Sequence, residues 1–295
     1  MANSIEKFKK YIVGLLDEVY QHASKTAVLD GAPELARQGA NADELIIPKI
    51  DMDGLGDYDR NTGYTQGDVT FTNETVKCNF DRGRMFTVDN VENMDTAGMA
   101  FGRLSGEFIR TKVVPELDAF RFAIYAATSG ADITARTAVY ADGEAVRKAI
   151  AAKYDKMTDE EVPVEGRHLF ITSTLHGMIR DMDTIKSKEL FDKFASVTIV
   201  PQSRFYTAIE QLDGKNGDEK KGGYKKSDAG YELDFLIIEK SAVIQYQKHV
   251  APKTITPDQN QDADAYKFGY RNVGIADTYE NKAAGIAGVY ANVSG

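Results

Sequence analysis

The chain has 295 residues, 42% of them hydrophobic, so it is long enough to bury a core in one or two domains. Acidic residues (45) outnumber basic ones (36), and the net charge of −9 argues against tight neutralisation of nucleic-acid phosphates. There is no signal-peptide pattern and no run of 18 apolar residues, so we expect neither secretion nor a membrane partner. The only cysteine, Cys78, excludes an intrachain disulfide framework and is typical of a small apolar core residue.

Residues 4–26 carry apolar side chains at helical spacing, and Asn3 and Glu6 are placed like a capping box. This pattern predicts an amphipathic helix near the N-terminus. The chain then stays polar until Leu45, so the apolar stripe has no local partner. We therefore expect the stripe to dock elsewhere on this subunit or on another one.

Two alternating segments, 45–52 and 68–80, predict strands that form a long hairpin. The connection between them has about fifteen residues rich in Gly, Asp and Asn, whereas most β-hairpins close in roughly two to five residues. A two-stranded ribbon of this kind is marginally stable alone in water and needs a surface to lie on. In an assembly, a neighbouring subunit supplies that surface.

The longest helical pattern covers residues 97–127, and its phase slips near Pro115. A proline inside a helix removes a backbone hydrogen bond, so we expect a bent helix or two helices in tandem. Gly98, Gly102 and Gly106 recur every fourth residue on one face. Each costs about 1 kcal/mol relative to alanine in a helix interior, so we expect another backbone to approach that face closely, as an inter-subunit contact.

From 130 to 265 the pattern is mixed α and β. We expect a helix at 142–154, a solvated Lys/Gly loop at 213–230, and strands at 132–140, 167–173, 197–200 and 232–239. The remaining segments, 265–277 and 283–293, alternate again around a short turn. They predict a hairpin that ends the chain.

No motif of catalysis or metal binding appears: the sequence has no Walker loop, no HExxH, no GxSxG and no CxxC. Four histidines, His22, His168, His176 and His249, are scattered without metal-ligand spacing. The best cation candidate joins Asp57, Asp59, Asn61 and Asp68, but Thr62 stands where a calcium loop requires glycine. We interpret it as a solvated turn and the charge run 218–226 as a solvated loop. We expect no enzymatic activity, no cofactor and no metal.

In the order of these elements and in the amino-acid sequence of several segments, the chain resembles the major capsid proteins of tailed double-stranded DNA phages and prophages, which have the Hong Kong 97 fold. The segments are IPKIDMDGLGDYDRNTGYTQGDVT, CNFDRGRMFTVD, GEFIRTKVVPELDAFRF, and the closing KFGYRNVG and NKAAGI. The resemblance covers nearly the whole chain. Its motifs are structural, and their number and order make it specific.

The resemblance implies an α+β chain of the Hong Kong 97 type, divided into five segments. They are an N-terminal arm (1–44), an E-loop hairpin (45–80), a peripheral domain with the spine helix (81–129), an axial domain (130–265) and C-terminal strands of the peripheral domain (266–295). The implied E-loop lies over an adjacent subunit. Tyr and Arg are enriched at interface hot spots, so Tyr58, Arg60 and Tyr64 are the expected anchors at its tip.

The resemblance also implies partners and a location. The partners are other copies in hexamers and pentamers, a separate scaffolding protein, a portal, and packaged double-stranded DNA contacted without sequence specificity. The chain would assemble in the bacterial cytoplasm and end in the virion capsid.

Some family members join their subunits covalently through an E-loop lysine. Residues 53–67 contain no lysine here, and the nearest lysines are Lys49 and Lys77. Arg60 stays protonated and cannot replace a neutral amine as the nucleophile.

Two other interpretations stay open. An encapsulin-like nanocompartment shares the fold, and only its contents or its genomic neighbours would distinguish it from a phage shell. An α+β enzyme is the second, because carboxylates can cluster in space without a sequence motif. A pocket that gathers Asp57, Asp59 and a histidine would favour the enzyme.

Overall fold

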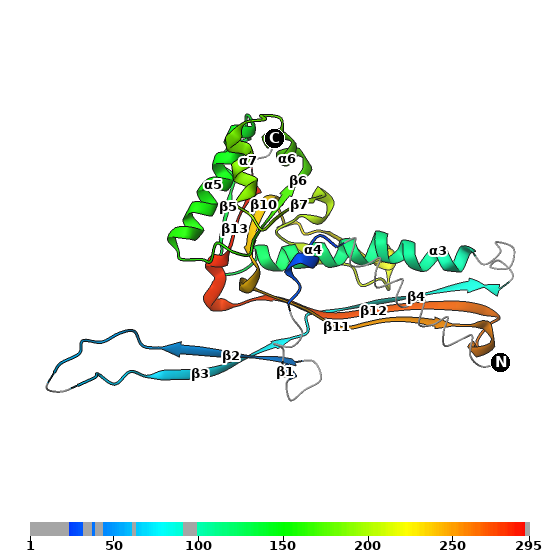
Figure 1. Ribbon diagram of the computed structural model, residues 1–295. Coiled ribbons are helices and arrows are strands. Elements are labelled where there is room, and N and C mark those ends of the chain that lie inside the picture. The colour runs from blue at the N-terminus through cyan, green and yellow to red at the C-terminus, as the bar shows by residue number, and fades with distance from the viewer. Residues whose placement is uncertain (1–23, 32–36, 39–43, 61–62, 91–98, 293–295) are drawn as a thin grey trace.

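A computed structural model of the chain describes residues 24–31, 37–38, 44–60, 63–90 and 99–292. Figure 1 shows three parts: a hairpin that projects from the body, a long helix that runs along a three-stranded sheet, and a lobe of helices and strands on the far side of that helix. The expected α+β composition is confirmed. Most of the N-terminal helix predicted over 4–26 lies outside the described residues, and its last three residues, 24–26, are not helical.

The projecting hairpin consists of β2 (Glu44–Met52) and β3 (Val69–Lys77), which pair antiparallel along their whole length. A short strand, β1 (Arg37–Gln38), pairs with β2 near the hairpin base. Both long strands lie where the alternation predicted them. The second predicted strand was too long, however, because β3 ends at Lys77 and a new strand, β4, begins at Phe80.

The long helix runs from α3 (Met99–Phe108) through a π-helical turn (Ile109–Val113) into α4 (Val114–Ala126). Pro115 stands in the first turn of α4, where its missing N–H cannot bond to the carbonyl four residues earlier. The wider π turn lies directly before it and accommodates the lost bond. The predicted phase slip is thus confirmed, as a change of winding within one continuous helix.

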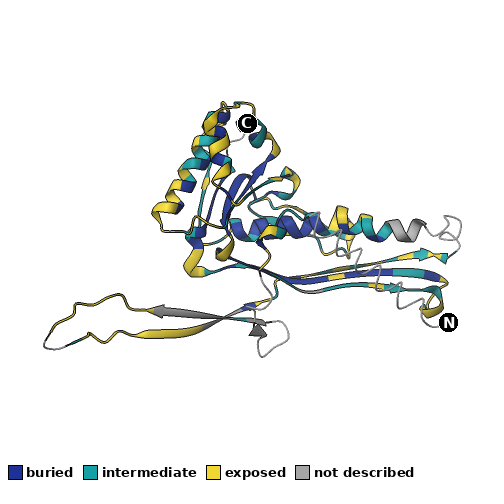
Figure 2. Cartoon of the chain, in the orientation of Figure 1, coloured by how far each residue is buried: buried dark blue, intermediate teal, exposed yellow. Residues whose placement is uncertain are grey.

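The three-stranded sheet has the order β11-β12-β4, with β11 at Val243–Ile255, β12 at Ala265–Thr278 and β4 at Phe80–Asp89. The long helix covers one face. There the ring of Phe108 lies 4.7 Å from Phe86 and 6.5 Å from Phe268, measured between centroids. Along β4 every second residue from Asp81 is exposed, so this strand opens its opposite face to solvent (Figure 2).

The lobe is built on a five-stranded mixed sheet. Its strands, in spatial order, are β5 (Asp132–Ala135), β13 (Ile286–Ala291), β10 (Glu232–Glu239), β6 (Arg167–Thr172) and β7 (Ser196–Val200). The lobe helices are α5 (Gly143–Asp159), α6 (Ser173–Arg180) and α7 (Ile185–Asp192). Two apolar cores sandwich this sheet, one toward the long helix around Phe122 and Phe170, the other toward α5 around Ile150 and Ile171.

The predicted closing hairpin is wrong. β12 pairs with β11 and β4, whereas β13 leaves that sheet and enters the lobe between β10 and β5. Consequently β11, assigned to the lobe by sequence, belongs to the three-stranded sheet, and β13, assigned to that sheet, belongs to the lobe. The strand predicted over 132–140 is also shorter, since β5 ends at Ala135.

The Lys/Gly segment 213–230 is more ordered than the solvated loop that the sequence predicted. It contains β9 (Tyr224–Lys226), which pairs with β8 (Ile209–Gln211). Arg82 of β4 donates to the carbonyls of Leu212 and Gly223 at 2.7 and 3.3 Å and so ties this small hairpin to the three-stranded sheet. Six short 3₁₀ turns complete the described elements: Ala27–Leu29, Gln202–Arg204, Gly217–Lys221, Lys240–Ala242, Pro257–Gln259 and Glu280–Gly285.

Candidate assembly surface

The outer half of the β2–β3 hairpin rests on no other part of the described chain (Figure 1). Large apolar side chains along it are open to solvent: Met52 is 66% exposed, Phe71 72% and Tyr64 89% (Figure 2). A ribbon of two strands gains little stability alone, and an exposed row of apolar side chains marks an interaction surface. The hairpin therefore has the properties of an arm that is covered in an assembly.

The tip of the hairpin, which we define as residues 53–68, is narrow and held by local bonds. Asp53 and Asp68 close its base, because the Asp68 N–H donates to the Asp53 carboxylate at 2.8 Å and the Asp53 N–H to the Asp68 carbonyl at 3.1 Å. Near the apex, Asp59 and Gly63 bond to each other through their backbones. Gly63 has φ of +82°, a conformation that favours glycine.

Of the three expected tip anchors, the structure brings two together. The rings of Tyr58 and Tyr64 lie 4.9 Å apart, in a tilted arrangement that suits two aromatic rings. Arg60 lies between them in sequence, at the exposed end of the tip. Whether these three side chains contact another subunit stays a prediction.

The glycine face of the long helix is only partly described. Gly98 lies outside the described residues, and Gly102 belongs to α3, but the surroundings of its side-chain position are not described. A Cβ added at Gly106 would meet no described atom outside its own helix within 4 Å, so no other described backbone approaches it closely. The expected close approach at Gly106 thus has no partner among the described residues, and an inter-subunit contact there stays a prediction.

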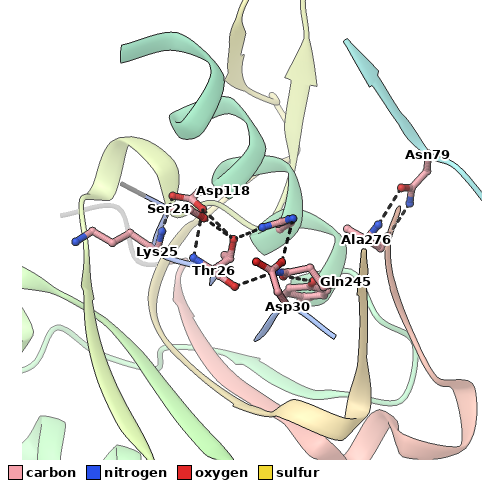
Figure 3. Close-up of polar contacts among 10 residues, drawn as sticks. Ser24, Lys25, Thr26, Asp30, Asn79, Asp118, Gln245 and Ala276 are labelled. Carbon is pink, nitrogen blue, oxygen red and sulfur yellow. Dashed lines mark hydrogen bonds and ion pairs between the residues drawn. The ribbon is translucent and has the colours of Figure 1, made fainter. Parts of the chain in front are cut away.

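The base of the hairpin is fastened to the three-stranded sheet by a small apolar cluster and a side-chain bridge. Val76 packs with Ile244 and Ile275, and Cys78 lies against them, which agrees with the expected role of Cys78 as an apolar filler. The side-chain N–H of Asn79 donates to the Ala276 carbonyl at 2.6 Å, and the side-chain oxygen of Asn79 accepts from the Ala276 N–H at 3.1 Å (Figure 3). These two bonds are the ones that the backbone of a neighbouring strand would make. Asn79 therefore extends the sheet at the point where the chain passes from hairpin to β4.

A buried carboxylate fastens the N-terminal segment to the long helix. Asp118 of α4 is 0% exposed. It accepts from the Ser24 hydroxyl at 2.8 Å, from the Lys25 N–H at 3.0 Å, and from both the N–H and the hydroxyl of Thr26 (Figure 3). The guanidinium of Arg204 lies 3.2 Å away and supplies the opposite charge. A buried charge is tolerated only with such partners.

Gln245 of β11 continues the same network toward the sheet. Its amide donates to the Thr26 carbonyl at 2.7 Å and to the Asp30 carboxylate at 2.6 Å, and its carbonyl accepts from the Tyr125 hydroxyl at 2.7 Å (Figure 3). Burial raises the pKa of Tyr125 above its ordinary value, so it remains a donor at neutral pH. Arg121 of α4 also donates to the Thr26 hydroxyl at 2.8 Å. We call residues 24–31, Asp118, Arg121, Tyr125 and Gln245 the anchor. It joins the N-terminal segment, helix and sheet.

Sequence reasoning missed the anchor. The partners are far apart in the chain, with Ser24 and Asp118 separated by 94 positions and Thr26 and Gln245 by 219. Alternation and helical spacing report which face of an element is buried, and they carry no information about such pairs. The only local signal was two hydroxyl residues, Ser24 and Thr26, at the end of an apolar stripe.

The groups considered for catalysis or metal binding lie apart. His168 bonds to the Ser196 hydroxyl, and His176 stacks on Phe191; burial lowers the pKa of both. Asp57 and Asp59 lie at the exposed tip of the hairpin, whereas His168 lies on β6 and His176 on α6, in the lobe. The described residues include no group of three or more His, Cys, Asp or Glu that could hold a metal ion. No described helix is long and apolar enough to span a membrane.

No protein-family model matches the sequence, and a search of curated proteins also finds no match. Solved structures do match. The cyanophage P-SCSP1u capsid is 12% identical with a TM-score of 0.55, over 88% of this chain and 86% of that one. The mature capsid of bacteriophage PhiM1 is 9% identical with a TM-score of 0.57, over 88% and 85% of the chains. This chain has the Hong Kong 97-type capsid fold.

The Hong Kong 97-type fold is also present in a third match, a virus-like particle from Pyrococcus furiosus. That structure is 9% identical with a TM-score of 0.57, and the likeness covers 97% of this chain and 99% of that one. The likeness therefore includes the projecting hairpin, the long helix and the lobe together. The expectation of this fold from the sequence resemblance is confirmed.

Proposed function

We propose that this chain is the major capsid protein of a tailed double-stranded DNA bacteriophage, and that its copies form the icosahedral shell around the DNA. The observation that carries the proposal is the likeness to phage capsid structures over most of the chain. A second observation supports it: the hairpin exposes apolar side chains that no described part of the chain covers. In this function the protein is a structural subunit and not an enzyme.

We assign the parts of the fold to the roles that the resemblance implied. The β2–β3 hairpin serves as the E-loop and the long helix as the spine. The three-stranded sheet of β4, β11 and β12 forms the peripheral domain with that helix, and the five-stranded lobe forms the axial domain. This assignment moves β11 to the peripheral domain, because it pairs with β12, and β13 to the axial domain, because it pairs with β10 and β5.

The partners follow from the same proposal. Copies of the chain form hexamers and pentamers, with a separate scaffolding protein and a portal during assembly in the bacterial cytoplasm. Contacts with the packaged DNA are loose and independent of sequence, since a chain of net charge −9 does not neutralise phosphates strongly. In the mature particle the protein resides in the virion capsid.

A nanocompartment shell is the second candidate, and the likeness to the Pyrococcus furiosus virus-like particle over nearly both whole chains favours it. The two functions differ in what the shell encloses. Particles purified from a host that carries the neighbouring genes hold nuclease-protected double-stranded DNA in the first case. In the second case they hold a cargo protein.

Size-exclusion chromatography with light scattering tests the shared part of the proposal. The purified chain, alone or with its scaffold, should elute as rings, sheets or shells of many times 32.5 kDa. A monomer of 32.5 kDa at every concentration, with scaffold present, would contradict it.

A further inference from the structure

Residues 136–142, which we call the connector, join β5 to α5 in the lobe. At its start the Arg136 N–H donates to the Tyr290 carbonyl at 2.8 Å. The next five residues, 137–141, lie in no helix or strand and make no hydrogen bond with any residue that the structure describes. Val139 among them is 60% exposed. The position of the connector therefore depends on its side chains.

Tyr140 and Arg136 hold the connector through side-chain contacts. Tyr140 packs against the apolar core that faces α5. The Arg136 guanidinium lies over its ring, 5.5 Å from the centroid, as a cation stacks on an aromatic face. Arg136 also pairs with Asp234 of β10, because its Nη1 lies 3.2 and 3.3 Å from the two carboxylate oxygens. A series of contacts thus runs from Asp234 through Arg136 to Tyr140.

Asp234 occupies an irregular point of β10. The pairing of β10 with β13 shifts between Leu233 and Phe235, so Asp234 is the extra residue of a β-bulge. Leu233 belongs to the apolar core toward the long helix, and Phe235 to the core toward α5. Bulges re-aim side chains, and this one directs a carboxylate that is only 7% exposed toward Arg136.

The ion pair compensates the buried charge of Asp234 only in part. An arginine that binds a carboxylate well uses two nitrogens, one for each oxygen. Here Arg136 uses Nη1 for both oxygens, and its buried Nε has no partner among the described residues. A buried carboxylate with incomplete partners favours its protonated form. In agreement, burial raises the pKa of Asp234 to about 6, although Arg136 lowers it, and Glu232 raises it further.

We infer that Asp234 acts through Arg136 and Tyr140 as a latch for the connector, and that uptake of a proton by Asp234 tightens the latch. The latch belongs to the single subunit and is independent of the proposed shell function.

The direction of the pH dependence follows from what opening does to Asp234. An open connector admits water to the carboxylate, and its pKa then returns toward the ordinary value of 3.8. The closed connector is therefore favoured most below about pH 4, and this advantage is lost as the pH rises through about 6. The groups that face Asp234 are Arg136, Tyr140 and Glu232. Burial raises the pKa of Tyr140 to about 12, and an arginine stays protonated, so neither changes charge in this range.

Hydrogen exchange of the Arg136 amide in the full chain tests the latch, because its bond to the Tyr290 carbonyl must break when the connector opens. After correction for the intrinsic exchange rate, its protection factor in the parent should be about tenfold higher at about pH 5 than at about pH 7.5. Asp234→Asn cannot titrate and should give equal protection at both. Asp155→Asn, which changes an exposed carboxylate of α5, is the matched control and should keep the difference. Equal protection in the parent at both pH values, or a difference that persists in Asp234→Asn, would overturn the proton control.

The amide of Leu236 separates local opening from unfolding of the whole lobe. Leu236 lies in the middle of β10, with a strand on each side, so its protection should exceed that of Arg136. Equal protection at the two amides would show that the connector has no opening of its own.

Tyr140→Leu provides an independent variant, since it keeps an apolar side chain at the core and removes the ring under Arg136. It should lower the protection of the Arg136 amide at both pH values and leave that of Leu236 near the parent's value. If the Arg136 amide in Tyr140→Leu is as protected as in the parent, the ring does not hold the connector and the latch is wrong.

Discussion

Asp118 is the central acceptor of the anchor, because it accepts four hydrogen bonds from residues 24–26 and forms an ion pair with Arg204. In Asp118→Ala these donors and the guanidinium lose their acceptor in a buried site. We expect the free energy of unfolding to fall by about 3–5 kcal/mol, measured by denaturant titration. Asp183→Asn, which breaks an exposed ion pair with Lys188, is the control and should unfold as the parent does. If Asp118→Ala had the same free energy of unfolding as the parent, the anchor would not be needed for stability.

Asp234 should make stability depend on pH. It lies at a bulge in β10, 3.2 Å from the Arg136 guanidinium, and burial raises its pKa from 3.8 to about 6, although Arg136 lowers it. The folded state therefore favours the protonated acid. The stability that Asp234 contributes is fully present below about pH 4 and is lost as the pH rises through about 6. Parent and Asp234→Asn should thus differ in the slope of unfolding free energy across this window, and equal slopes would contradict the prediction.

Single residues were the hardest features to predict. Tyr58 and Tyr64 could be named because they occupy the tip of a hairpin that the local pattern reveals. Asn79 and Gln245 could not, since each is an ordinary polar residue in sequence. Their roles come from the backbone and side chains that folding places next to them.

The elements themselves were predicted well where their pattern is long. The hairpin, the long helix with its irregularity at Pro115, and β6, β7 and β10 lie where hydrophobic spacing predicted them. Pairing was predicted less well. β12 and β13 follow each other in sequence, yet β13 crosses to the lobe, because its four successive buried residues from Ile286 to Val289 are covered on both faces there. The short helices α6 and α7 escaped detection, since eight residues hold too few turns to show a period.

Gly106 offers a test at the scale of the helix. No described residue outside the helix lies within 4 Å of a Cβ built there, so Gly106→Ala should stabilise the isolated subunit by about 0.5–1 kcal/mol through helix propensity. Gly106→Leu should also fold, as judged by its melting temperature. If the glycine face contacts another subunit, the leucine variant should nevertheless assemble poorly. Normal particles from Gly106→Leu would show that no backbone approaches this position in the shell.

At the scale of the whole molecule, the apolar cluster of Val76, Ile244 and Ile275 and the Asn79 bridge hold the body end of the hairpin, while no described residue covers its tip. A fixed base and an uncovered tip suit a hairpin whose tip contacts a neighbouring molecule while its base stays in place.

The tip contains no lysine between Asp53 and Gly67, and Arg60 cannot act as a nucleophile. Subunits of the mature shell should therefore be held by non-covalent contacts. Particles boiled in denaturing detergent with reductant should release one band near 32.5 kDa. A ladder of multimers that survives this treatment would refute the non-covalent shell.

The most direct test of the shell function is electron cryomicroscopy of particles purified after expression of this chain with its scaffold. We predict closed icosahedral shells whose capsomers show the long helix and the lobe of each subunit, with each hairpin lying on an adjacent subunit. Well-folded protein that forms no closed particle under these conditions would contradict the proposed function.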